Sequence, residues 1–116
     1  MQAVRANDDW AMLEPEVMEI DGRLDNGTAP DVEEDARLCI QSGARNMVFD
    51  CRRLTYMSGA GLRVLLSLAR EMKMAGGKFA VCGLQPQVKE MFEAAGLNAV
   101  IPAYSNPGEA TVARAA

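Results

Sequence analysis

Two short apolar runs separated by one long amphipathic segment constrain the fold of this chain most strongly. The runs "NMVFDC" (46–51) and "KFAVCG" (78–83) have the length and composition of buried β-strands. Between them, residues 58–75 repeat apolar side chains at helical spacing, and two glycines at 76–77 end the repeat. A strand, a helix and a second strand in this order predict parallel strands joined by a right-handed crossover.

The N-terminal third continues the alternation of strands and helices. Residues 11–22 carry a short extended pattern interrupted by Pro15, which is typical of an edge strand or of a turn between two strands. A further short strand is predicted within residues 2–5. A helix follows, with Thr28 as its N-cap, Pro30 in its first turn and Gly43 at its end.

The C-terminal third adds a helix that opens at Pro86 and ends at Gly96, a last strand in "NAVIP" (98–102), and a helical tail from Pro107. The complete order is β-β-α-β-α-β-α-β-α, which predicts one α/β domain over residues 1–116. We expect a small, mixed and largely parallel sheet of roughly four to five strands.

The composition narrows the functional classes. The chain has 116 residues, 49% of them hydrophobic, so it can build one core without a metal or a disulfide. It has no histidine, which removes the commonest general base and metal ligand, and no metal site, cofactor or catalytic residue is expected. A net charge of −4 argues against nucleic acid as a partner. No apolar run reaches membrane-spanning length, so we expect a cytoplasmic protein without membrane insertion.

The three cysteines support the same compartment. Cys39, Cys51 and Cys82 each lie within an apolar segment and form no Cys-x-x-Cys pair. Buried free thiols in a reducing compartment are therefore expected.

The stretch "YMSGAGL" (56–62) stands at the start of the central helix. Ser58 is placed to be its N-cap, and Gly59, Ala60 and Gly61 follow with uncovered backbone amides. A glycine in a helix costs about 0.5–1 kcal/mol relative to alanine. Two of them indicate close approach, either by a neighbouring strand or by a ligand. The spacing of a phosphate loop, GxxxxGK[ST], is absent.

One side of the same helix carries a mostly cationic row. The row consists of Arg63, Ser67, Arg70 and Lys73, on the opposite side from the apolar stripe. It is either a solvated face or half of a docking surface for an acidic partner.

Three stretches resemble a known family. They are "GRLD" (22–25), "MVFDCRRLTYMSGAGLRVLL" (47–66) and "GGKFAVCGLQPQVKEMFEAAGL" (76–97). In them the chain closely resembles the STAS domain (sulfate transporter and anti-sigma factor antagonist), and most closely the single-domain bacterial anti-sigma factor antagonists, also called anti-anti-sigma factors. The resemblance spans nearly the whole chain, and it implies the STAS fold, with helices mainly on one face of the sheet.

The resemblance implies a switching protein and not an enzyme. Members of this family bind an anti-sigma factor, often a serine protein kinase, and so release a sigma factor for transcription. The kinase phosphorylates a serine at the start of the helix that here follows Met57, and a phosphatase reverses the modification. In the family pattern, the acceptor serine stands between an Asp or Ser and a Ser, Thr or Ala, before Gly-Leu.

The acceptor position of the pattern falls on Gly59, with Ser58 before it and Ala60 after it. Glycine has no hydroxyl, so we expect no phosphorylation there and a protein held in its partner-competent state. Ser58 is the possible substitute acceptor, although a capping hydroxyl is already engaged. Asp25 matches an acidic position of the family's nearby loop, or it is a turn residue that bonds its own backbone.

The expected partner-binding residues are therefore Asp25, Ser58, Gly59, Ala60, Gly61, Arg63, Ser67 and Arg70. The alternative function is a STAS subunit of a lipid-transport ABC ATPase or a signalling-complex scaffold. The resemblance also implies weak purine-nucleotide binding at the start of the helix.

Overall fold

The computed structural model describes residues 16–110 of the chain, and the strand expected within residues 2–5 lies outside them. In chain order, the elements are β1 (Glu16–Glu19), β2 (Gly22–Leu24), α2 (Ala29–Gln41), β3 (Asn46–Asp50), β4 (Leu54–Met57), α3 (Gly59–Met74), β5 (Lys78–Cys82), α4 (Pro86–Ala94), the 3₁₀ turn η1 (Leu97–Ala99) and β6 (Ala103–Tyr104). Residues 107–110 form the start of the expected helical tail.

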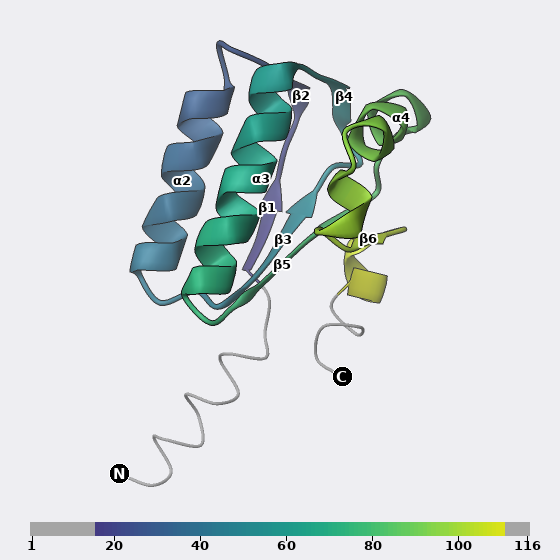
Figure 1. Cartoon of the computed structure of the whole chain (residues 1–116). Helices are drawn as coiled ribbons and strands as arrows, with labels where there is room; N and C mark the ends of the chain where they lie inside the picture. The colour runs from purple at the N-terminus through teal and green to yellow at the C-terminus, as the bar shows by residue number, and fades with distance from the viewer. Residues whose placement is uncertain (1–15, 111–116) are drawn as a thin grey trace, which may run out of the picture.

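The main sheet has four strands in the order β1-β3-β5-β6, and every neighbouring pair is parallel. β3 is one of its two inner strands, and its five residues are all buried, as the apolar run "NMVFD" predicts. A separate parallel pair, β2 and β4, lies at the end of this sheet where α3 begins (Figure 1). The expected α/β fold with a largely parallel sheet is confirmed.

The two faces of the sheet are packed differently. Met47 and Phe49 of β3 belong to the larger core, which takes buried side chains from α2, α3 and α4. Val48, between them, points to the other face, where Ala110 of the C-terminal turn joins a smaller cluster. Helices therefore cover mainly one face, and α2 and α3 lie side by side on it (Figure 1).

The predicted strand at residues 98–102 is wrong. The backbone N–H groups of Val100 and Ile101 both donate to the Leu97 carbonyl, at 3.0 and 2.8 Å, and close a tight turn instead. Ile101 is buried as a core side chain, and the strand begins only at Ala103, where it pairs with Val81.

Two strands have no counterpart in the predicted order. β2 has three residues, and β4 places buried Leu54 and Met57 around two exposed residues, which is not a period-two pattern. Their pairing with each other makes them strands.

The cysteines follow the prediction in two cases of three. All three thiols are free, and burial raises the pKa of the Cys51 thiol to about 12 and that of Cys82 to about 11. Cys39 on α2 is only half-buried, which corrects the prediction for that residue. Among residues 16–110, no helix is long and apolar enough to cross a membrane.

Candidate functional site

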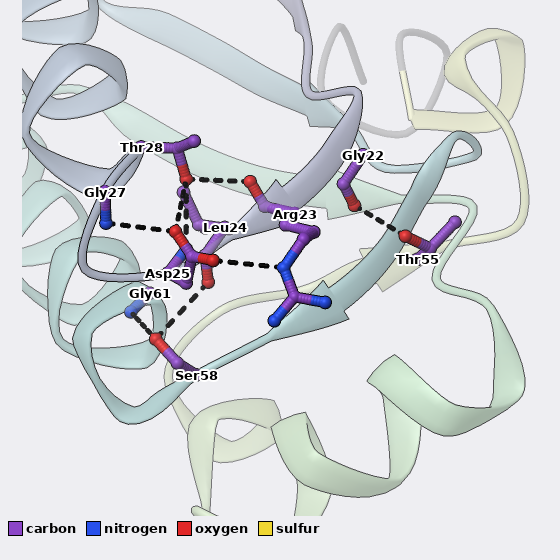
Figure 2. Close-up of polar contacts among 9 residues, drawn as sticks. All are labelled: Gly22, Arg23, Leu24, Asp25, Gly27, Thr28, Thr55, Ser58 and Gly61. Carbon is purple, nitrogen blue, oxygen red and sulfur yellow. Dashed lines mark hydrogen bonds and ion pairs between the residues drawn. The ribbon is translucent and has the colours of Figure 1, made fainter.

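The start of α3, which we call the helix mouth (residues 58–61), is built on the end of β2. The Ser58 N–H donates to the Leu24 carbonyl at 2.9 Å, so the chain leaving β4 is tied to β2 at this point. The Ser58 hydroxyl accepts from the Gly61 N–H at 3.4 Å and lies 3.5 Å from the Leu24 carbonyl, to which it can donate (Figure 2). Ser58 is thus the N-cap that the sequence predicts.

Gly61 is the inner glycine of the mouth, and it is buried. A Cβ atom there would lie 2.6 Å from the Leu24 carbonyl oxygen and 2.9 Å from side-chain atoms of both Leu24 and Met57. Any side chain would push β2 away from α3. Close approach by a neighbouring strand therefore explains this glycine.

Gly59 is the outer glycine, and it is exposed. A Cβ atom built on it would meet Arg63 Nη1 at 3.7 Å, an ordinary van der Waals contact, and its φ is not in the left-handed region. Within residues 16–110, nothing in the fold requires glycine at this position. The first turn of α3 also carries no acidic side chain of its own.

Asp25 lies beside the mouth, in the loop that follows β2. Its carboxylate accepts from Arg23 Nε at 3.1 Å and from the Gly27 N–H at 3.0 Å (Figure 2). The Arg23 guanidinium is the main cause that holds the pKa of the Asp25 carboxyl below its usual value. Asp25 thus does form the turn that the sequence allows.

Thr28 completes this loop without capping α2 through its side chain. Its hydroxyl donates to the Arg23 carbonyl at 2.7 Å and accepts from the Asp25 N–H at 3.0 Å. The loop is therefore closed by its own hydrogen bonds, and Asp25 keeps a partly exposed side chain next to the mouth.

A neighbouring pair, Arg23 and Tyr56, is not predicted by the sequence patterns. The Arg23 guanidinium lies 4.2 Å from the centre of the Tyr56 ring, and Tyr56 is 39% exposed. Arginine and tyrosine are enriched at the energetic centres of protein interfaces. Both lie within quoted motifs, but only the pairing of β2 with β4 brings them together.

The cationic row on α3 divides into two parts. Arg63 and Arg70 are exposed, whereas Ser67 is half-buried and faces α2. Arg37 of α2 reaches across, with Nη2 3.5 Å from the Ser67 hydroxyl and Nε 2.9 Å from the Glu71 carboxylate. Ser67 therefore lies at the interface between the two helices rather than on the open surface predicted for it.

The structure brings Asp25, Ser58, Gly59, Ala60 and Arg63 together around the mouth. A shallow hollow of about 320 Å³ between α2 and α3 includes Ala60, Arg63 and Ser67 in its lining. Arg70 lies further along α3, in a separate hollow. That these residues contact a partner stays a prediction.

A buried carboxylate away from the mouth, that of Asp50, has a local role. Asp50 at the end of β3 accepts from Arg52 Nε and Nη2 at 3.0 and 2.9 Å and from the Arg52 N–H at 3.2 Å. This pairing lowers the pKa of Asp50. No group of three acidic or thiol side chains within residues 16–110 is arranged to hold a metal ion.

The fold is that of a small α/β domain with a parallel sheet, helices mainly on one face, and a central helix whose first residue is exposed. The STAS domain model matches residues 13–110, and the chain belongs to this family.

Relatives and solved structures agree with this assignment. The chain is 34% identical over 94 residues to BtrV of Bordetella bronchiseptica, which is named as an anti-sigma factor antagonist, and the match covers 81% of this chain and 80% of BtrV. It is 29% identical over 91 residues to the anti-sigma F factor antagonist of Paenibacillus polymyxa, with 78% of each covered. The unphosphorylated anti-sigma factor antagonist SpoIIAA, which is also solved from Bacillus in a phosphorylated form, has the same fold, with a TM-score of 0.72, 21% identity and 84% of each chain covered.

Proposed function

We propose that this protein is an anti-sigma factor antagonist, which binds an anti-sigma factor and thereby releases a sigma factor for transcription. The observation that carries the proposal is the 34% identity to BtrV over 81% of this chain. The exposed mouth of α3 fits it, because a partner can approach Gly59 and Ala60 without displacing any described segment. The protein then acts in the cytoplasm, where sigma factors act.

The proposed partner is an anti-sigma factor of the serine-kinase type, and the proposed contact surface surrounds the mouth. It comprises the exposed or half-buried members of the predicted set, namely Asp25, Ser58, Gly59, Ala60 and Arg63, with Gly61 as the residue that holds the mouth against β2. The Arg23–Tyr56 pair adds an aromatic and cationic edge to this surface.

The protein is not switched off by phosphate at the family position. Gly59 carries no hydroxyl, and the Ser58 hydroxyl is engaged by the Gly61 N–H and the Leu24 carbonyl. A phosphate would add about −1.5 to −2 charges at the contact surface. Without an acceptor, the surface stays uncharged at Gly59 and competent to bind.

The test measures binding of the purified chain to serine-kinase anti-sigma factors encoded beside its gene, by calorimetry. Gly59→Asp places a negative charge at the mouth and should weaken the complex by at least tenfold, on the order expected for an unfavourable charge at an interface. Gly59→Ala is the matched control, because it adds a Cβ without charge, and it should bind like the parent. Equal binding by Gly59→Asp and the parent would show that the mouth is not the contact surface.

Phosphorylation is tested separately by incubation with the same kinase and ATP, followed by peptide mass spectrometry. The parent should take up no phosphate, whereas Gly59→Ser should be modified at the introduced serine and lose its partner. Phosphate on Ser58 of the parent would overturn the proposal that the protein is constitutively active.

A further inference from the structure

Two arginines on the outer face of α3 differ from the other arginines of residues 16–110. The others are each held by the protein itself: Arg23 by Asp25, Arg37 by Glu33 and Glu71, Arg52 by Asp50, Arg53 by Asp21, and Arg45 by the carbonyls of Ile40 and Ala44. Arg63 and Arg70 are exposed and have no such partner in the described part of the chain.

The same two arginines flank an apolar hollow. A depression of about 580 Å³ on α3 is lined by Arg63, Leu66, Ser67, Arg70, Glu71 and Met74. Leu66 is half-buried, and Met74, the last residue of α3, is 89% exposed, so the two side chains give the hollow an accessible apolar part. The Glu71 carboxylate is already paired with Arg37 at 2.9 Å, so it does not neutralise the arginines.

The neighbouring helix has the opposite charge. Asp31, Glu34 and Asp35 are exposed along α2, and the whole chain has a net charge of −4. This acidic balance disfavours an extended polyanion such as a nucleic acid, whose binders carry a broad basic surface. A compact acidic protein surface can contact α3 alone.

We propose that the outer face of α3, from Arg63 to Met74, binds an acidic protein surface that places carboxylates against Arg63 and Arg70 and an aliphatic side chain in the hollow beside Leu66 and Met74. This inference rests on the proposed function, and it identifies that acidic surface as part of the anti-sigma factor. The contact surface then runs from the mouth along the full length of α3.

The charged and the apolar contacts are expected to act on different rate constants of the complex. Exposed charges act mainly by steering association, and they are screened by salt. The apolar contact at Met74 forms only after docking, so it sets how fast the complex dissociates.

The experiment measures the association and dissociation rates of the full chain with its anti-sigma factor, at low and high ionic strength. Arg70→Glu should lower the association rate on the order of tenfold at low salt, with a smaller difference at high salt. Met74→Ala should raise the dissociation rate and leave the association rate unchanged. Lys89→Glu is the matched control, since Lys89 is an exposed cation on α4, away from this face.

The outcomes separate this inference from the proposed function. If Gly59→Asp weakens binding while Arg70→Glu and Met74→Ala behave like the parent, the acidic contact is wrong and the proposed function stands. If the parent binds no anti-sigma factor, both are wrong. If Arg70→Glu instead changes self-association in sedimentation velocity or binding to single-stranded DNA, the face serves another copy or a nucleic acid, and the inference is overturned.

Discussion

The inner and outer sides of the first turn of α3 carry the same residue type for different reasons. Gly61 faces β2 and β4, and the Leu24 carbonyl would lie 2.6 Å from any Cβ placed there. Gly59 faces outward, and a Cβ there would meet only Arg63 Nη1, at 3.7 Å. The inner glycine is therefore a requirement of the fold, whereas the outer one leaves the chemistry of the surface open.

The largest effect that separates the two sides is expected from Gly61→Ala. The added methyl group meets a backbone carbonyl, which cannot rotate away, so β2 and α3 must separate. We expect a loss of about 3 kcal/mol of the free energy of unfolding, at the upper end for overpacked sites. Urea denaturation followed by circular dichroism measures it, and a loss below about 0.5 kcal/mol would show that the two glycines are equivalent.

Ser58→Ala tests the hydrogen bond that joins the start of α3 to the buried Gly61. The hydroxyl that bonds the Gly61 N–H is lost, and we expect the protein to lose about 1 kcal/mol of stability, as for other N-caps. Ser58→Asp keeps an acceptor at the same place and serves as the control for stability. An unchanged denaturation midpoint in Ser58→Ala would mean that the 3.4 Å contact contributes nothing.

Gly59→Ala should have a smaller effect of the opposite sign. Alanine fits the helical backbone at this position and reduces the freedom of the unfolded chain, so a gain of about 0.5 kcal/mol is expected. The same denaturation experiment measures it. If this variant were less stable than the parent, the outer position would also lack room for a side chain.

The smallest expected effect is on the pH dependence of folding stability, to which Asp25 contributes. Its carboxyl has a lowered pKa in the folded protein, below the value of 3.8 of a free side chain, so the unfolded state binds the proton more readily. Its contribution to stability is therefore present above pH 3.8 and is lost as the pH falls through the folded pKa.

In Asp25→Asn this acid-dependent loss should be reduced, while the loss that comes from Asp50 remains, because Arg52 lowers the pKa of Asp50 in the same direction. Thermal melting over the acidic range compares the two proteins. Identical curves would show that the Arg23–Asp25 pair has no energetic coupling to folding.

Sequence patterns predicted the long elements of this fold and the region of β1, but they missed β2 and β4 and misplaced β6. The run "NMVFD" and the repeat that became α3 carry enough apolar positions to define a buried strand and a helix. β2, β4 and β6 have two to four residues, and only their hydrogen-bonded neighbours make them strands. Residues 98–102 have strand-like composition, but the hydrogen bonds to the Leu97 carbonyl turn them into a bend.

The candidate site was predictable where its features are local. The Ser58 cap and the openness of Gly59 follow from residues adjacent in the chain. The Arg23–Tyr56 pair and the inward position of Ser67 depend on which elements lie side by side, β2 with β4 and α2 with α3. A pattern within a single helix cannot show which of its polar positions a second helix covers.

A side chain can be added at Gly59 without a steric clash, and this has an evolutionary consequence. Some glycine codons become serine codons through a single base change, and a serine at this position would meet no steric obstacle among the described residues. A lineage can therefore gain or lose a hydroxyl here in one mutational step, without compensating changes in the core. Signalling control over a protein of this shape can be acquired or discarded as a heritable trait while its architecture stays the same.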